Sequence, residues 1–540
     1  MSGMGIYGLS GSGIDVDSMV KMGMMTKQNE YDRMYKKEIR NEWEKEAYTN
    51  LYSEINTFNN STLSKYKMSS TTNPQNVSSS DTSVFTATAN ADAAQMSHTV
   101  EVRNLASNAY MLTGEAGITR TGTAGSIYLK DVIDTSTMSA GSSLDIYVSD
   151  GENEGTVSIT YEQIVDNKQT LNDLASAFKK LGINITASYD STNDTFSLYN
   201  KDSGKDNKII LAAKDTNAKA LLNNLNLNAV TNDNGTSTMT PKTFEVATFN
   251  SDGEPTANAV KVEGTNAEVV IDGRTYNSSS NKISASNVTY TLLSTGKANA
   301  TVSQDTDKII ENVKQFVEDY NKIMDMLNEK YYEEKYSDYD VLTQSQEKSM
   351  TKEQIDKWNE KAKSGILNHS NTVGKIISNM REALYTPVTS VDSNYNTMMS
   401  LGISSSTDRG HISLDEDKLK KALAADPDAV YQVFASSGEK TKTNADGTTS
   451  TYTDYNAQGV MQRISDKLYD GLKEINSYAG NSSEVDDSSA LGNLIRELKT
   501  KMSNFKVMMT SYENLLYKKY DAMETAIQRL SYQSGYITGQ

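Results

Sequence analysis

Both ends of this chain carry the pattern of long amphipathic helices, and the residues between them do not. Apolar residues recur at spacings of three and four over residues 19–68 and 491–530, without a proline. Residues 76–300 instead form short alternating runs rich in Ser, Thr, Asn and Gly. Such a chain should return on itself. We therefore predict a multidomain α+β protein, with a helical coiled-coil stalk formed by both termini and β-rich head domains inserted in the middle.

The strongest periodicity lies in the C-terminal segment. One set of residues falls every seven positions: Leu491, Leu498, Phe505 and Tyr512. A second set is offset from the first by four and three: Ile495, Met502, Met509, Leu516, Met523 and Leu530. Heptads sustained over this length are typical of a coiled coil, and an ordinary amphipathic helix packed on a core is the alternative.

The N-terminal helix is expected to begin near Asp17 or Ser18, both good N-cap residues, and to extend to about Met68. Asn73-Pro74 should end it, because proline disfavours helical geometry in the preceding residue. Another helix should begin at Asp305. We expect the C-terminal heptads to pack against residues 43–62 and 309–327. The predicted stalk-packing residues are Tyr48, Leu51, Ile55, Phe58, Val313, Phe316, Tyr320, Leu498, Met502, Phe505, Met509, Tyr512 and Leu516.

The middle of the chain is expected to form short, half-buried strands. The period-two pattern places Val100 and Val102 on one face. The same pattern recurs at Leu144–Val148, Val157–Ile159, Phe196–Leu198, Phe244–Val246 and Val288–Leu292. Asp272-Gly273 predicts a hairpin turn. A helix capped by Thr170 and ended by Gly182 interrupts the strands. Residues 120–245 are therefore expected to be an α+β subdomain inserted in a β-rich one.

The region between the middle and the C-terminal helix contains several shorter elements. We expect helices at Thr351–Ala362 and Ser370–Leu384, and a short strand at His411–Leu414. Asp415 should cap a helix through Ala424, and Asp426-Pro427 should start the next one, because proline is favoured at the first helical position. Residues 436–456 are expected to be a loop, and the tyrosine-rich stretch 331–365 carries no motif.

The composition excludes several classes of protein. A net charge of −17 argues against binding to nucleic acid or to anionic lipid, because both need clustered Lys and Arg. Apolar runs are too short to span a bilayer, and the N-terminus lacks the basic and apolar regions of a cleaved signal peptide. Cysteine is absent, which excludes disulfides and thiolate chemistry. Export in an unfolded state or a proteome with low cysteine usage would each account for that.

We find no residue pattern that predicts catalysis or a cofactor. The three histidines, His98, His369 and His411, lack a second ligand at metal-binding spacing. Walker, zinc and nucleophile-elbow motifs are missing, and Asn232–Gly235 is better explained as a turn than as a calcium loop. We therefore predict a protein that is not an enzyme, binds no cofactor or metal, and works through its surfaces.

Six motifs in order resemble the flagellar filament-capping (FliD, or hook-associated protein 2) family. They are Gly8–Val20; Val100–Ala106; Val270–Gly273 with Asn281–Ile283 and Val288–Leu293; Phe316–Asn321; Leu401–Ile403 with Gly410–Leu423, Asp426-Pro427 and Phe434; and Tyr520–Glu524 with Ala526-Ile527 and Tyr532–Ser534. The match is weakest across residues 120–245. Together the motifs extend over almost the whole chain.

The resemblance implies a cap at the distal end of the bacterial flagellar filament. Such a cap is an extracellular homo-oligomeric ring, most often a pentamer, that retains exported flagellin and promotes its ordered polymerisation. The implied partners are a second copy of the chain, flagellin, hook–filament junction proteins and a flagellar export chaperone. Export would use the flagellar type III system without a cleaved signal peptide, and neither nucleic acid nor membrane insertion is expected.

The resemblance also implies four parts. Residues 1–42 with 517–540 would be a mobile terminal helical segment, and residues 43–75 with 304–516 the stalk. Residues 76–119 with 246–303 would form a β-rich head domain, and residues 120–245 an inserted α+β head domain. The residues expected to dock on the filament are Leu9, Ile14, Met19, Met523, Ile527 and Leu530. Met19, Met22, Met24 and Met25 would serve either docking or an ordinary helix core.

Two alternatives share parts of this pattern. A hook–filament junction protein or a flagellin relative would also have helical termini. A head-domain adhesin that binds host glycan would use the variable middle.

Overall fold

The computed structural model describes residues 15–166, 168–233, 236–406, 408–444, 448–481 and 487–538. The chain divides into two compact units. The first, which we call the helical unit, comprises Met1–Asn73 and Thr306–Gln540. The second, the β-rich unit, comprises Pro74–Asp305. Helices at both termini and β-sheets in the middle confirm the predicted fold class.

The helical unit is built mainly from five helices. These are α1 (Val16–Thr57), α7 (Thr306–Tyr332), α10 (Asn371–Tyr385), α13 (Val460–Ala479) and α14 (Ala490–Thr538). Its shorter helices are α2 (Ser69–Thr72), α8 (Gln344–Glu347), α9 (Lys352–Lys363), α11 (Glu416–Ala425) and α12 (Ala429–Ala435). Its strands are β20 (Ile403–Ser405), β21 (Ile412–Leu414), β22 (Ser437–Thr443) and β23 (Thr449–Gln458).

Helix α1 begins two residues before the predicted start. Asp15 is the N-cap, because its side chain accepts a hydrogen bond from the Ser18 backbone N–H at 3.0 Å. The helix runs without interruption to Thr57, then widens into a π-helical turn (η1, Phe58–Leu63) and tightens into a 3-10 turn (η2, Ser64–Lys67). The helical stretch therefore extends close to Met68, as predicted.

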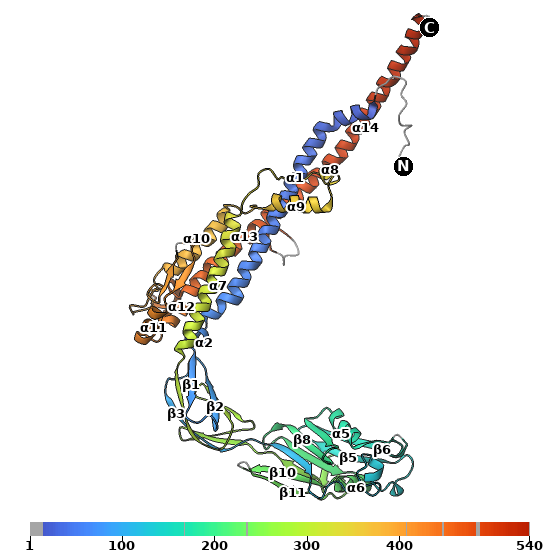
Figure 1. Cartoon of the computed structure of the whole chain (residues 1–540), viewed down its shortest axis with the longest axis vertical. Coiled ribbons are helices and arrows are strands. Elements are labelled where there is room, and N and C mark those ends of the chain that lie inside the picture. Colours follow the sequence, from blue (N-terminus) through green and yellow to red (C-terminus); the bar gives the residue numbers. More distant parts are fainter. Residues whose placement is uncertain are drawn as a thin grey trace. The chain divides into compact units, whose positions relative to one another are not determined.

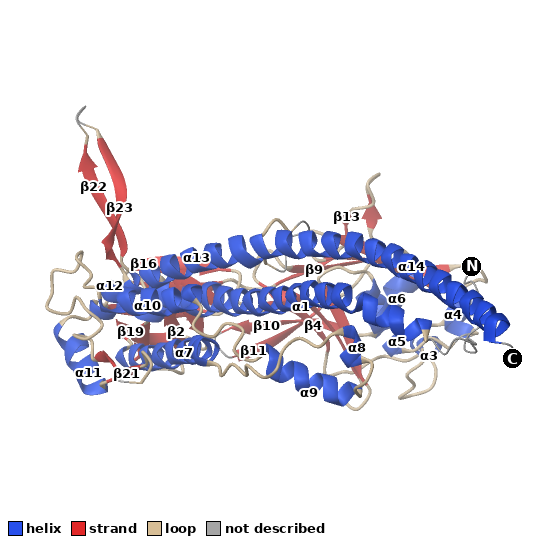
Figure 2. Cartoon of the chain, turned by 90° about the horizontal axis from the view of Figure 1, so that it is seen from above, coloured by secondary structure: helices blue, strands red, loops and turns tan. Residues whose placement is uncertain are grey.

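Helices α1 and α14 lie side by side and antiparallel (Figures 1 and 2). At the start of α14, Lys45 forms an ion pair with Asp487. Farther along, Lys499 binds Glu42 at 2.6 Å. Near the start of α1, the Tyr517 hydroxyl donates to Asp17 at 3.1 Å. The N-terminal residues of α1 therefore lie beside residues far along α14, as expected for two antiparallel helices.

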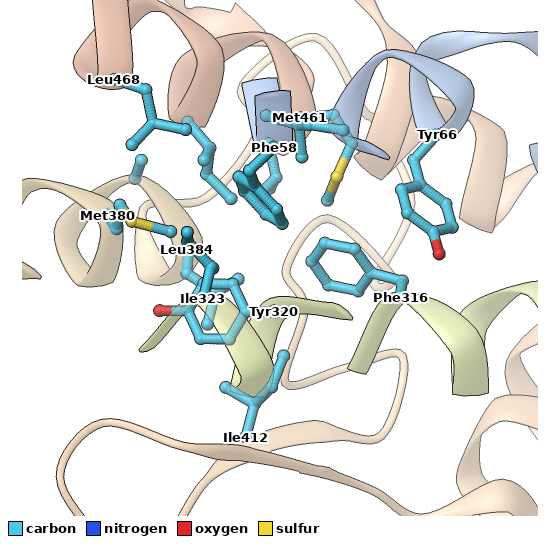
Figure 3. Close-up of a cluster of buried hydrophobic side chains, with 14 of the residues drawn as sticks. Phe58, Tyr66, Phe316, Tyr320, Ile323, Met380, Leu384, Ile412, Met461 and Leu468 are labelled. Atoms are coloured by element: carbon cyan, nitrogen blue, oxygen red, sulfur yellow. The ribbon is translucent and has the colours of Figure 1, made fainter. Parts of the chain in front are cut away.

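The core of the helical unit lies where α7, α10 and α13 pack against the C-terminal half of α1 (Figure 3). Phe316 of α7 is fully buried at its centre, with edge-to-face ring contacts to Tyr66 at 5.3 Å and to Phe434 at 5.2 Å. Met461 of α13 lies near Phe58 in the same cluster (Figure 3). Helix α13 was not predicted from the sequence.

Two local predictions for this unit are wrong. The prediction of a loop over residues 436–456 is wrong, because its described residues contribute to the antiparallel hairpin β22–β23, which projects from the helices (Figure 2). Pro427 is not the first residue of a helix, because Asp428 is the N-cap of α12 and Pro427 lies in the preceding turn. The predicted cap Asp415 is confirmed, since its side chain accepts a backbone N–H. The two predicted helices are confirmed as α9 and α10, whose N-caps are Thr351 and Ser370.

One core of the β-rich unit lies between a five-stranded and a three-stranded antiparallel sheet. The strand orders are β1-β19-β3-β15-β16 and β17-β18-β2. These strands are β1 (Gln75–Ser79), β2 (Phe85–Ala89), β3 (Ser97–Asn104), β15 (Ala267–Ile271), β16 (Arg274–Ser278), β17 (Lys282–Ala285), β18 (Val288–Leu292) and β19 (Gly296–Gln304). The Asp272-Gly273 hairpin turn is confirmed: both residues have positive φ, 49° and 81°, as a type I′ turn requires.

A second core contains two further antiparallel sheets and four helices. The sheets are ordered β11-β10-β4-β8-β7 and β14-β9-β5-β6. Their strands are β4 (Asn108–Thr113), β5 (Ser143–Ser149), β6 (Glu154–Thr160), β7 (Ile185–Asp190), β8 (Thr195–Ser203), β9 (Lys208–Ala213), β10 (Leu227–Asp233), β11 (Thr236–Pro241) and β14 (Val260–Glu263), and a separate pair is β12 (Thr248–Phe249) with β13 (Pro255–Ala257). The helices are α3 (Leu129–Val132), α4 (Tyr161–Val165), α5 (Leu171–Lys180) and α6 (Thr216–Asn224), with a 3-10 turn η3 (Thr135–Thr137).

The second core extends beyond residues 120–245, because β4 pairs with β8 and β14 pairs with β9. The predicted helix with Thr170 as its N-cap is confirmed as α5, which has a capping box with Asp173. The predicted strand Phe244–Val246 is wrong. Phe244 is fully buried, but its segment forms only one isolated bridge, from Val246 to Ala213.

Candidate assembly surface

The seam between α1 and α14 contains most of the predicted C-terminal heptad residues. Leu498, Met502 and Leu516 are buried, and Phe505 and Met509 are half-buried. Tyr512 differs, with 37% of its surface exposed. A straight α-helix advances 3.6 residues per turn, so a strict heptad position drifts by about 20° per heptad. The heptad set that ends at Tyr512 rotates out of the seam for this reason.

The structure separates two groups of residues that the sequence analysis placed together. Tyr48, Leu51, Ile55, Phe58, Val313, Phe316 and Tyr320 are all buried in the core of the helical unit. The heptad residues after Leu498 lie instead along the N-terminal half of α1. The expected packing of these heptads on residues 43–62 and 309–327 is therefore wrong.

The unpredicted helix α13 is the reason for this difference. It occupies the position beside residues 48–59 that the heptads were expected to fill. The Ser465 hydroxyl donates to Asn59 at 2.7 Å, and the Tyr48 and Tyr478 rings meet edge to face at 5.4 Å. The sequence signal was an apolar stripe at spacings of four and three: Val460, Ile464, Leu468, Leu472 and Ile475.

Lys499 links the two helices of the seam electrostatically. Its Nζ atom lies 2.6 Å from Glu42 and 3.4 Å from Glu38. Glu38 is almost fully buried, and that burial, together with the neighbouring Glu42 carboxyl, raises the pKa of Glu38. The hydrogen bond to Glu42 raises the pKa of Lys499. Lys499 of α14 is thus held by two carboxylates of α1.

Apolar side chains also lie on the solvent side of the helix pair. On α14, Met508, Tyr512 and Leu515 follow one another at spacings of four and three and lie on one face, which we call the outer stripe. All three are exposed, Leu515 at 58%. On α1, Met22 and Met25 are exposed as well. Exposed apolar side chains gathered on one face are typical of a protein-binding surface.

The predicted docking residues fall into three groups. Met19, Met523 and Ile527 are half-buried, and Leu530 is 63% exposed. Leu9 and Ile14 lie outside the described residues. The last turns of α14 extend past the described start of α1 (Figure 1), so that this part of α14 has no helix beside it in the described chain. Leu530, in this part of α14, is available to another molecule.

The tyrosine-rich stretch forms an arm against the middle of α1. Lys36 and Arg40 pair with Asp340 at 3.1 and 2.9 Å, and the Trp358 indole N–H donates to the Asp340 carbonyl at 2.7 Å. Lys363 lies over the Trp43 ring at 5.4 Å. Sequence reasoning missed this arm because single charges and aromatic residues give no periodic signal. The arm, α1 and α7 border a groove of about 780 Å³.

The histidines make local contacts. His98 Nδ1 lies 2.6 Å from Asp272, and His411 Nε2 lies 2.7 Å from Asp325. Within the described ranges, no group of three His, Cys, Asp or Glu side chains could hold a metal ion. None of the described helices is long and apolar enough to cross a membrane.

Two family models match this chain. Residues 12–109 match the flagellar hook-associated protein 2 N-terminus, and residues 264–532 match its C-terminus. The chain belongs to the flagellar hook-associated protein 2 family. Membership in this family supports a structural role as a cap of the flagellar filament.

Relatives carry the same family name. The flagellar hook-associated protein 2 of Halalkalibacterium halodurans is 25% identical over 547 residues, which cover 97% of each chain. That of Escherichia coli K12 is 24% identical over 86% of each chain. Among solved structures, the D1-D2-D3 domains of the E. coli flagellar cap protein FliD align with a TM-score of 0.47 and 19% identity, covering 84% of this chain and 99% of that one.

Proposed function

We propose that this chain caps the distal end of the bacterial flagellar filament. In this role it forms a homo-oligomeric ring, most often of five copies, that retains exported flagellin and promotes its ordered addition. Its partners are further copies of itself, flagellin, the hook–filament junction proteins and an export chaperone. Export through the flagellar type III system would place it outside the cell. No catalytic step is part of this function.

The observation that carries the proposal is the α1–α14 pair of a hook-associated protein 2 family member. Its seam is closed by buried side chains, whereas the outer stripe and the last turns of α14 present apolar side chains to solvent. Small apolar contacts of this kind form and dissociate readily, since each buries a modest area. A cap must release and rebind each time a flagellin subunit is added.

We assign four parts to the chain. The mobile terminal segment comprises residues 1–42 and 517–540, and the stalk comprises residues 43–75 and 304–516. The β-rich head comprises residues 76–119 and 246–303, with residues 120–245 as the inserted head domain, although β4 and β14 of the β-rich head pair with strands of the inserted one. In the single chain, α1 is continuous across residue 42 and packs on α14. Mobility of the terminal segment would therefore involve separation of that seam or movement of the pair as one body.

We assign filament docking to Met19, Met523, Ile527 and Leu530, with Leu9 and Ile14, and extend it to the outer stripe. Met19 lies half-buried on α1, and Leu530 is exposed at the end of α14. Flexible methionine side chains adapt to differently shaped apolar partners. Such adaptability suits a surface that meets successive filament subunits.

Immunogold electron microscopy of isolated filaments tests the proposal. Label confined to the distal end is the expected result. Label at the hook end would instead identify a hook–filament junction protein, and label along the whole filament would identify a flagellin relative. Filament ends without label, with glycan binding by the secreted protein, would favour an adhesin and contradict the cap.

A further inference from the structure

Arg463 is a buried cation without a partner. It is among the largest fully buried side chains of the described chain, with 0% of its surface exposed. Its three guanidinium nitrogens have no hydrogen-bond acceptor among the described residues. A guanidinium stays charged under all physiological conditions, and buried charges are normally paired. This side chain therefore needs an anion or several acceptors that the described protein atoms do not supply.

Among the described residues, no carboxylate forms an ion pair or hydrogen bond with Arg463. Burial lowers the pKa of Arg463, and Tyr455 opposes this shift. The nearby carboxylates Glu382 and Asp466 act on Tyr455. Asp466 already accepts a hydrogen bond from Gln462 at 2.7 Å. A second cation, Lys467, also lies over the Tyr455 ring, at 5.2 Å, and adds to the positive potential there.

The surroundings of Arg463 carry further donors. The residue lies in the first turn of the 20-residue helix α13, whose N-cap Gly459 provides no side-chain hydrogen bond. Its guanidinium carbon is 5.9 Å from the ring centroid of Tyr455, which precedes the helix on β23. The Tyr455 hydroxyl is likewise buried without a partner in the described chain. The start of a helix carries partial positive charge and attracts anions.

We propose that Arg463, the Tyr455 hydroxyl and the start of α13 bind a small monovalent inorganic anion, for which chloride is the probe. A halide accepts several hydrogen bonds from any direction and fits donors that are not arranged for a planar carboxylate. A divalent oxyanion would bring a second charge into a buried site at a much larger desolvation cost. Because Tyr455 belongs to β23 and Arg463 to α13, the bound anion would fasten the β22–β23 hairpin to the helical unit.

Thermal unfolding of the full-length chain tests this site. Sodium chloride is exchanged for sodium gluconate at constant ionic strength, so that only the anion changes. The unfolding temperature of the unaltered chain should rise with chloride in a saturable way, because a ligand that binds only the folded state stabilises it. Arg463→Met should abolish this response. Tyr455→Phe keeps the ring, removes one donor, and should weaken the apparent chloride affinity roughly tenfold.

Lys467→Met is the matched control, since it removes a cation from the same face of α13 but not the buried one. It should retain the chloride response. If Arg463→Met does not fold, Arg463→Lys replaces it, and a weakened but measurable response is expected. Anomalous diffraction from bromide-soaked crystals of the full chain should place an ion beside Arg463.

Equal chloride responses in the unaltered chain and Arg463→Met would overturn the proposal. A gain in stability of Arg463→Met that is equal in both salts would also overturn it, because the Arg463 guanidinium would then be a buried charge with no bound anion. Bromide density without any chloride dependence in solution would mean an adventitious ion only, and would also overturn it.

Discussion

A Cβ atom on Gly23 of α1 would lie 2.7 Å from the Cδ1 atom of Leu516 on α14. Leu516 is buried at 6% exposure, although it lies far along α14 from the core of the helical unit. The two helices therefore approach closely near the start of α1, where the sequence predicted a free and mobile end.

Gly23→Val should weaken the α1–α14 seam, because a β-branched side chain cannot avoid Leu516 and has lower helix propensity than alanine. We expect a loss of about 1–3 kcal/mol in the local opening free energy, measured by hydrogen exchange of residues 19–35. Gly23→Ala is the control. Its loss should be smaller, because the Leu516 terminus can rotate and alanine favours the helix by about 1 kcal/mol. Equal exchange in both variants would contradict the close contact.

Glu38→Gln should stabilise the seam at neutral pH. Burial raises the pKa of Glu38, so its charged form is disfavoured in the folded chain. The gain should be roughly 0.5–1 kcal/mol at pH 7, because the carboxylate also loses its 3.4 Å contact with Lys499. An acid with a raised folded pKa destabilises above that pKa, and the penalty disappears as pH falls toward 4.5, the ordinary value. Hence the advantage of the variant should vanish on acidification.

Thermal unfolding from pH 4 to pH 8 measures this effect. Glu42→Gln serves as the control, since Glu42 is more exposed and holds Lys499 at 2.6 Å. It should not stabilise the chain at pH 7. A Glu38→Gln advantage that persists unchanged at low pH would refute the assigned cause.

Asp272→Ala should destabilise the β-rich unit by about 1–3 kcal/mol. The Asp272 carboxylate accepts hydrogen bonds from the Thr99 N–H at 2.9 Å and contacts His98 Nδ1 at 2.6 Å. The contact with His98 lowers the pKa of Asp272. A depressed pKa gives stability above the ordinary value of 3.8 that is lost as pH falls through the folded pKa. Denaturant unfolding should therefore show a deficit at pH 7 that narrows at strongly acidic pH.

Asp272→Asn is the matched control for that turn. Asparagine tolerates positive φ and can still accept from the Thr99 N–H, so it should lose less stability than alanine. A loss as large as that of alanine would show that the negative charge alone matters.

Met508→Glu with Leu515→Glu should abolish capping without unfolding the chain. Both side chains are exposed, so charge there leaves the seam intact, but it makes the outer stripe polar. In a bacterium that lacks its own cap, the double variant should release flagellin into the medium where the unaltered chain builds filaments. Thr510→Glu places charge on another exposed face of α14 and is the control. Normal filaments from the double variant would show that the outer stripe is not part of the docking surface.

Local chemistry explains what could be predicted from the sequence. Thr170 and Asp173, which lie within four residues, form the side-chain-to-backbone hydrogen bonds that cap the first turn of α5. Asp272-Gly273 sets its hairpin turn through two positive φ angles. Neither depends on distant contacts. The heptad stripe on α14 likewise identified the buried positions Leu498, Met502 and Leu516, but not the exposure of Tyr512.

Partners across the chain could not be predicted in the same way. A stripe shows which face is buried and not which helix covers it, so the heptads were assigned to the wrong half of α1. The β22–β23 hairpin has exposed residues on both faces over much of its length, and its strands therefore carry no period-two signal. Arg463 lies on α13, a helix that was not predicted from the sequence, and only the fold shows that its side chain is buried.

Counting subunits in particles of the purified full-length chain by electron microscopy tests whether the chain assembles as a cap. Closed rings of one size, most often with five copies, are expected. The Met508→Glu, Leu515→Glu variant should keep its fold while failing to cap filaments. A chain that stays monomeric at all concentrations, or that polymerises into long open filaments, would contradict the proposed cap.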